Sequence, residues 1–198
     1  MSIAHRELHT CNDNHKFEHV DGIITMMSPG SPSHTHTNIN IFRILDSHPK
    51  KGKCRVYMEN MKIHFSKDDI FIPDIAAFCK KMTFTKDGTL TSPDLVVEVL
   101  SPSTAKNDRT RKMQVYGKSG VCEYWIIEPS TRCIEVYHNQ DGTMVMSDLC
   151  AALSQGDIES LQQDGKHVPA SSFETSLFGG ITIDLYKVFE DILPEEGY

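Results

Sequence analysis

The stretch Pro93-Asp94-Leu95-Val96-Val97-Glu98-Val99-Leu100 carries the strongest structural signal of the chain. Aliphatic residues occupy both alternating faces of this run, which is typical of a strand covered by helices on both sides of a sheet. Glu98 interrupts the run and shares a face with Asp94, because alternate strand residues point the same way. An unpaired carboxylate there is costly, so Glu98 needs a partner. An arginine, backbone amides and a metal ion all remain open.

The preceding apolar segment, Phe71-Ile72-Pro73-Asp74-Ile75-Ala76-Ala77-Phe78, contains a second acid. Pro73 cannot donate to a strand ladder, which predicts a bulge or a sheet edge at this point. Two acids on neighbouring buried strands make an oxygen-rich set of the kind that Mg²⁺ or Mn²⁺ prefers. Asp74 and Glu98 are therefore predicted to be the ligands of a divalent metal.

A helix is expected after the strand, from Ser103 or Thr104 to about Lys118. Asp108, Lys112 and Tyr116 follow one another at intervals of four residues and therefore lie along one face of it. Two interpretations are open. Either Asp108 and Lys112 form a surface ion pair beside a core tyrosine, or Lys112 leans over the two carboxylates and stabilises charge that develops on a phosphate.

The rest of the chain predicts an α/β fold with a mixed β-sheet flanked by helices and an N-terminal β-hairpin extension. Its length of 198 residues suits a single domain spanning residues 1–198, with 1–15 as a poorly ordered segment. The expected elements are a hairpin over 17–27 turning at Asp21-Gly22, a helix over 34–47, strands over 54–58, 61–65 and 70–79, a hairpin over 123–128 and 132–138, and a short helix near 185–192.

The net charge of −7 argues against tight binding of long duplex DNA, because phosphate contacts usually need a basic face. One local basic patch is nevertheless predicted on the second helix, from Lys106, Arg109, Arg111, Lys112 and Lys118.

The six cysteines form no Cys-x-x-Cys pair, which argues against a structural zinc site or a disulfide scaffold and favours reduced thiols. No apolar run approaches the roughly 20 residues of a membrane span, and the polar start lacks a secretory signal. A cytoplasmic protein without membrane contact is expected.

These motifs, in this order, resemble the Uma family, restriction endonuclease-like proteins of the PD-(D/E)xK superfamily. The resemblance covers nearly the whole chain. It implies a restriction endonuclease-like core, a nucleic acid as substrate, with DNA favoured over RNA, and, by analogy, a homodimer. The motifs that carry it are Pro73-Asp74, the segment 93–104, the helix residues 108, 112 and 116, and the segment 120–129.

By this resemblance, Asp74 is the superfamily's first metal-binding acid and Glu98 is the acid of its (D/E)xK element. The lysine of that element is missing, because position 100 is Leu100. The resemblance implies that Lys112, on the following helix, takes its place. Lys112 and Tyr116 also resemble the Gln-x-x-x-Tyr element of related nucleases.

Three further positions match the family with alternatives left open. Asp94 is either close to the metal or structural. Glu18 is the nearest candidate for the superfamily's early helix acid. His34 or His36 matches the family histidine, and spacing favours His34, although either could simply bond at a helix terminus.

Three functions are compatible with these expectations. In the first, Asp74 and Glu98 hold one or two divalent ions and Lys112 stabilises the transition state of phosphodiester hydrolysis. In the second, a nuclease-fold domain binds a protein or a nucleic acid without cutting it, since fold alone does not fix function. The third, a two-carboxylate hydrolase of another substrate, is disfavoured because no aromatic cluster suited to sugars is present.

Overall fold

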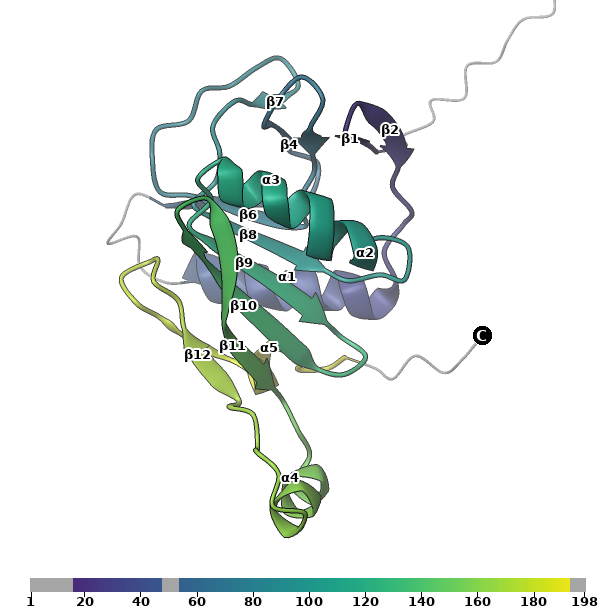
Figure 1. Cartoon of the computed structure of the whole chain (residues 1–198), viewed down its shortest axis with the longest axis vertical. Coiled ribbons are helices and arrows are strands. Elements are labelled where there is room, and N and C mark those ends of the chain that lie inside the picture. Colours follow the sequence, from purple (N-terminus) through teal and green to yellow (C-terminus); the bar gives the residue numbers. More distant parts are fainter. Residues whose placement is uncertain (1–15, 48–53, 193–198) are drawn as a thin grey trace, which may run out of the picture.

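A six-stranded mixed sheet forms the centre of the computed structural model, which describes residues 16–47 and 54–192 (Figure 1). The strand order is β11-β10-β9-β8-β6-β3; β8 and β9 run parallel and the other neighbours antiparallel. This confirms the predicted fold class. The strands are β3 (Arg55–Met58), β6 (Ile75–Phe78), β8 (Leu95–Val99), β9 (Glu123–Glu128), β10 (Cys133–Gln140) and β11 (Thr143–Ala151).

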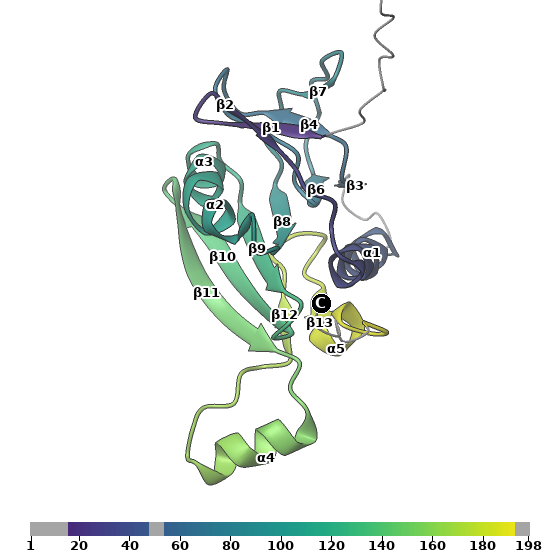
Figure 2. The same cartoon turned by 90° about the vertical axis from the view of Figure 1, so that its right-hand side faces the viewer.

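Helices cover both faces of this sheet (Figure 2). α1 (Pro32–Ser47) and the short α5 (Leu185–Val188) lie on one face, where Ile41 of α1 packs in the same core as Val97. On the other face lie α2 (Ala105–Asn107), the π-helix η1 (Asp108–Lys112) and α3 (Met113–Lys118). Every residue of β8 is buried, as the aliphatic run predicts.

A second, smaller sheet has the order β2-β1-β5-β4-β7. The expected strand over 70–79 is divided between the two sheets: β5 (Ile70–Phe71) belongs to the small one and β6 to the central one. The chain crosses between them at Pro73-Asp74, where Pro73 predicted a break, and this places Asp74 at the start of β6. The other strands are β1 (Phe17–Val20), β2 (Ile23–Met26), β4 (Lys62–His64) and β7 (Gly88–Thr89).

Several C-terminal elements have no counterpart in the sequence prediction. β11 extends the expected hairpin to three strands, and β12 (Ser172–Glu174) pairs with β13 (Thr182–Asp184). α4 (Gln155–Gln163) extends away from the sheet (Figure 2) and buries none of its residues. The final helix ends at Val188, four residues earlier than expected at 192.

Two local expectations were wrong. α1 begins at Pro32, because the Ser31 hydroxyl accepts the His34 backbone N–H at 3.2 Å and so caps the helix. Cys54 and Cys79 form a disulfide instead of staying reduced. They face each other across the antiparallel β3–β6 pair, whose register of Arg55 opposite Phe78 brings them together.

Three of the other cysteines, Cys122, Cys133 and Cys150, are free thiols. The segment 1–15, expected to be poorly ordered, lies outside the described residues. Among the helices that the structure does describe, none has the length and apolar character needed to traverse a bilayer.

The close approach of α3 to the β10–β11 turn gives a stability prediction. A Cβ added at Gly117 of α3 would lie 2.6 Å from the carbonyl oxygen of Gly142, in the β10–β11 turn. Gly117→Ala should therefore lower the free energy of unfolding by about 1–3 kcal/mol, measured by urea denaturation. Gly156→Ala in α4 is the matched control, because its nearest neighbour would be 3.9 Å away. Equal stability of the two variants would contradict this packing.

Candidate active site

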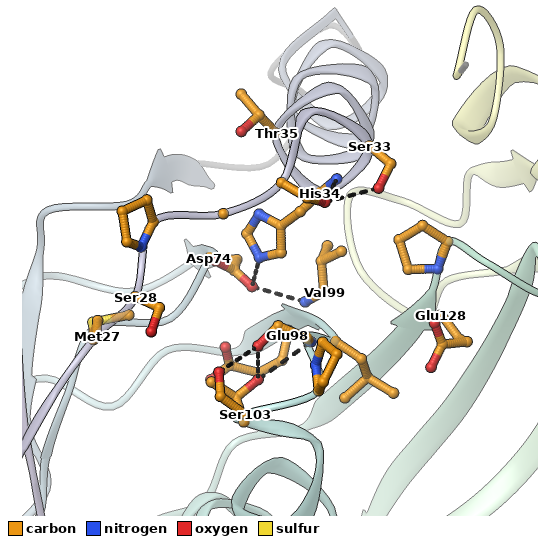
Figure 3. Close-up of a pocket in the computed structure, with 18 of the residues that line it drawn as sticks. Met27, Ser28, Ser33, His34, Thr35, Asp74, Glu98, Val99, Ser103 and Glu128 are labelled. Atoms are coloured by element: carbon orange, nitrogen blue, oxygen red, sulfur yellow. Dashed lines mark hydrogen bonds and ion pairs between the residues drawn. The ribbon is translucent and has the colours of Figure 1, made fainter. Parts of the chain in front are cut away.

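One cavity of about 1320 Å³ brings the predicted residues together. Asp74, Glu98 and Lys112 line it, and His34 reaches it from the first turn of α1 (Figure 3). Loop residues complete the wall on two sides, in the segments 27–31 before α1 and 100–104 after β8. Residues far apart in the sequence, His34, Asp74, Glu98 and Lys112, therefore share one pocket.

The pairing of β6 with β8 places Asp74 beside Glu98. In this antiparallel register Ile75 lies opposite Val97, so the residue before β6 reaches the last residues of β8. The Asp74 Oδ2 atom accepts the backbone N–H of Val99 at 2.8 Å. This bond fixes one oxygen of Asp74 against the strand that carries Glu98.

His34 holds the same oxygen of Asp74 from the opposite side. Its Nε2 atom lies 3.2 Å from Asp74 Oδ2 (Figure 3). Its Nδ1 atom lies 3.4 Å from the buried amide of Asn38. Burial alone lowers the pKa of His34, but the hydrogen bond and the charge of Asp74 outweigh burial and raise it. His36 does not line the cavity, so His34 is the histidine of the pocket.

Lys112 lies in a buried cluster of carboxylates. Its Nζ atom is 3.1 Å from Glu18 Oε1, 3.1 Å from Glu98 Oε1 and 3.4 Å from Asp108 Oδ1. The side chain is only 3% exposed, so the interpretation as a surface ion pair with Asp108 was wrong. An ammonium has three N–H donors, and three carboxylates surround this one.

Tyr116 completes the surroundings of Glu98. Its hydroxyl donates to Glu98 Oε1 at 2.6 Å, so this oxygen accepts from both Tyr116 and Lys112. Lys112 is the last residue of the π-helix over 108–112 and Tyr116 lies one turn further on in α3, so both side chains reach Glu98 from the same side. Within the part of the chain that is described, no hydrogen bond is made by Glu98 Oε2 or by Asp74 Oδ1.

The cluster holds a surplus of negative charge. Burial raises the pKa of Glu98 well above its usual range; Lys112 opposes this, but three neighbouring carboxylates add to it. Burial lowers the pKa of Lys112, and the surrounding carboxylates outweigh burial and raise it. A buried site with more carboxylates than cations favours a further positive charge. The three carboxylates that act on Glu98 are Asp108, Asp74 and Glu18.

Four predicted residues lie outside the cavity wall: Asp108 and Tyr116, which contact Lys112 and Glu98 as described above, and Asp94 and Glu18. Asp94 lies at the other end of β8, where its Oδ2 accepts the Cys79 N–H at 2.7 Å and its Oδ1 is 3.3 Å from Lys80. Of the two roles left open for Asp94, these contacts support the structural one. Glu18 belongs to strand β1 instead of a helix and lies behind Lys112, where it also accepts the Ile72 N–H at 2.8 Å.

Two further residues that line the cavity, Glu59 and Arg132, were not predicted from the sequence. Glu59 donates its backbone N–H to the Asp74 carbonyl at 2.9 Å, and its side chain is 2.7 Å from Lys16. Arg132 lines the far side, with a guanidinium N–H on the Phe189 carbonyl at 2.9 Å. The only signal for Glu59 was its position beside Asn60 in a tight connection between two strands. Loops of this kind carry no distinctive residue pattern.

The donor set fits a hard divalent cation. Among residues 16–47 and 54–192, no group of three or more histidine, cysteine, aspartate and glutamate side chains is arranged for a metal. Mg²⁺ commonly takes only one or two carboxylates, with water and substrate oxygens completing its shell. Asp74 and Glu98, each with one oxygen lacking a described hydrogen bond, meet that requirement, and the surplus negative charge favours it.

Comparison with known proteins identifies the family. Residues 5–165 match the model of Uma2, described as "Putative restriction endonuclease". The chain belongs to the Uma2 family. Two Synechocystis sp. (strain ATCC 27184 / PCC 6803 / Kazusa) relatives, the uncharacterized proteins slr1290 and sll1609, are 30% and 26% identical over 64% and 63% of this chain, and over 67% and 72% of their own lengths.

A solved structure has the same architecture. The crystal structure of a protein from Anabaena variabilis ATCC 29413, titled a "putative nuclease belonging to DUF820", matches with a TM-score of 0.62 at 19% identity. The match covers 89% of this chain and 91% of that one. At this identity the likeness establishes the shared fold.

The buried cluster predicts that replacing Lys112 lowers the stability of the protein far more than replacing the nearby Arg109. Lys112→Met should lower the free energy of unfolding by about 3–5 kcal/mol, because it leaves buried carboxylates without their cation. Arg109→Met is the matched control: Arg109 is 39% exposed and pairs with Glu135 alone, so its loss should cost at most about 1 kcal/mol. Urea denaturation measures both. A small effect at Lys112 would contradict the described charge cluster.

Proposed function

We propose that this Uma2 protein is a metal-dependent endonuclease of the PD-(D/E)xK type that hydrolyses phosphodiester bonds of nucleic acid. The observation that carries the proposal is the meeting of Asp74, Glu98 and Lys112 in one cavity. The family and the shared fold support it. Asp74 and Glu98 take the positions of the two superfamily acids, and Lys112 replaces the lysine missing at position 100.

Asp74 and Glu98 would hold Mg²⁺ or Mn²⁺ through Asp74 Oδ1 and Glu98 Oε2. When bound, such an ion supplies Lewis-acid charge that polarises the phosphate and acidifies an attacking water. His34 and the Val99 N–H fix Asp74 Oδ2, which orients the free oxygen toward the cavity. Tyr116 and Lys112 both donate to Glu98 Oε1 and so fix the orientation of the Glu98 carboxylate.

Lys112 contributes through its charge. Its Nζ atom donates to Glu98 Oε1 and lies within ion-pair distance of Glu18 and Asp108, so it orients Glu98 and would stabilise negative charge developing on the phosphate through its charge. Charge at close range in a poorly solvated site acts more strongly than in water. This explains how a lysine from a helix serves the chemistry that the superfamily assigns to a lysine on the strand.

Cleavage assays test the proposal. Single- and double-stranded DNA and RNA are incubated with Mg²⁺ or Mn²⁺, and products are resolved on denaturing gels. Asp74→Asn and Glu98→Gln should each lower the cleavage rate at least about a hundredfold, because each removes a proposed ligand charge. Asp94→Asn is the matched control, since Asp94 lies outside the cavity, and should retain the wild-type rate.

The alternative, a nuclease-fold domain that binds without cutting, makes a different prediction in the same assay. It replaces the endonuclease proposal if the wild-type protein and Glu98→Gln are equally inert on every substrate with either metal. Gel-shift titration of the same oligonucleotides then tests the binding function directly.

Tyr116 is proposed as a positioning residue that acts through Glu98. Tyr116→Phe removes only the hydroxyl at 2.6 Å from Glu98 Oε1. It should lower the cleavage rate or the Mn²⁺ affinity by about 10- to 100-fold, with Mn²⁺ binding measured by calorimetry. Tyr137→Phe is the control, because its hydroxyl bonds Glu135 outside the cavity. Normal Mn²⁺ affinity and rate in Tyr116→Phe would exclude this role.

A further inference from the structure

Four basic side chains line the described part of the cavity wall, and one of them has no carboxylate partner there. Lys16, His34 and Lys112 each lie within ion-pair distance of a carboxylate. Arg132, the fourth, is exposed, and no carboxylate of residues 16–47 and 54–192 pairs with it. Its positive charge is therefore available to an anion that enters the cavity.

The guanidinium of Arg132 is held by Phe189. One Nη2 N–H donates to the Phe189 carbonyl at 2.9 Å, and the central carbon of the guanidinium lies 5.8 Å from the centroid of the buried Phe189 ring. A guanidinium has five N–H donors, so these contacts orient the group and leave donors for another acceptor. Paired N–H donors of arginine match two oxygens of a phosphate. The carboxylate of Glu128 in the same wall is turned toward Ser130, whose hydroxyl donates to it at 2.8 Å.

The backbone of Arg132 has a conformation that rarely suits an arginine. Arg132 closes the turn between β9 and β10 with a φ of 53°, in the left-handed region where glycine and asparagine are favoured. Its carbonyl accepts the Ala152 N–H at 3.0 Å, which fixes this end of the turn to the end of β11. The turn itself gives no reason for an arginine, and residues held in such sparsely populated conformations gather at functional sites.

Arg132 lies at the same end of the central sheet as the two acids. Glu98 is opposite Ile126 of β9, and β9 ends two residues later at Glu128. Two residues along the strands and two strand spacings across put the backbone of Arg132 roughly 12 Å from that of Glu98. In Figure 3, Asp74 and Glu98 lie toward the middle of the cavity and Glu128 at its right-hand side. Arg132 is thus too far away to share one phosphate with the acids.

We infer that Arg132 binds a phosphate of the substrate near the one that is cut, and so fixes the position of the strand in the cavity. This inference rests on the proposed nuclease function, which it deepens by assigning a substrate-binding residue. Contacts to phosphate set the register of a nucleic acid without reading its sequence. The competing explanation is that Arg132 only fastens the β9–β10 turn to Phe189.

Salt dependence of binding separates these two roles, because each phosphate contact releases counterions. Binding of labelled DNA oligonucleotides, single-stranded and duplex, is measured by fluorescence anisotropy over a range of NaCl concentrations. Arg132→Asn removes the charge and suits the left-handed backbone. For the form of DNA that wild type binds more tightly, it should weaken binding about tenfold. It should also reduce the slope of log affinity against log salt by about 0.7–0.9, the contribution of one phosphate.

Two further variants complete the experiment. Lys118→Asn is the matched control, because Lys118 is an exposed cation outside the cavity, beside the β10–β11 turn. It should bind DNA with the affinity and salt slope of wild type. Arg132→Lys keeps the charge and should restore the slope. Urea denaturation of each variant shows that the fold is intact. In the cleavage assay, Arg132→Asn should raise KM about tenfold and leave kcat within about twofold of wild type.

Three outcomes overturn the inference. They are a wild-type salt slope in Arg132→Asn, loss of the slope in Arg132→Lys as complete as in Arg132→Asn, and no measurable DNA binding by wild type. Cleavage separates this inference from the nuclease proposal. If wild type cuts DNA and Arg132→Asn keeps the wild-type KM and slope, the role of Arg132 is wrong while the nuclease stands. If Arg132→Asn loses affinity and slope but wild type cuts nothing, the phosphate site stands and the nuclease proposal fails.

Discussion

The structure depends on one buried interaction, the contact of the Lys112 ammonium with three carboxylates. Each of these acids comes from a different element: Glu18 from β1, Glu98 from β8 and Asp108 from the π-helix. Removing any partner would leave charge buried without compensation, which costs more than the pair contributes when complete. The cluster therefore fixes the small sheet, the central sheet and the helix relative to one another.

This constraint also explains why the candidate site lies at this place. The chain leaves the small sheet at Pro73 and enters the central one at Ile75, so Asp74 lies where the two sheets meet. Lys112 holds the small sheet from one side through Glu18, and Ile72 donates its N–H to the same carboxylate. The groups proposed for chemistry are thus held by the same contacts that join the two sheets.

Those parts of the fold with a strong periodic pattern were predictable, such as β8 with its aliphatic run and the hairpin at Asp21-Gly22. β11 and α4 were not, because β11 is largely exposed and α4 buries nothing, so neither has an apolar pattern. The meeting of Asp74, Glu98 and Lys112 followed from strand order and the family resemblance. The π-helix that orients Lys112 has no sequence signature, and Asp94, about 13 Å along the strand from Glu98, could not share its site.

The surplus of negative charge links stability and metal binding. Lys112 balances only part of the charge of Glu98 and the three carboxylates near it, so the site favours another cation. A second group of ion pairs lies outside this cluster, where Arg111 of the π-helix pairs with Asp21 and Asp69. Charge pairs thus join this helix to the segments of the small sheet at two separate places.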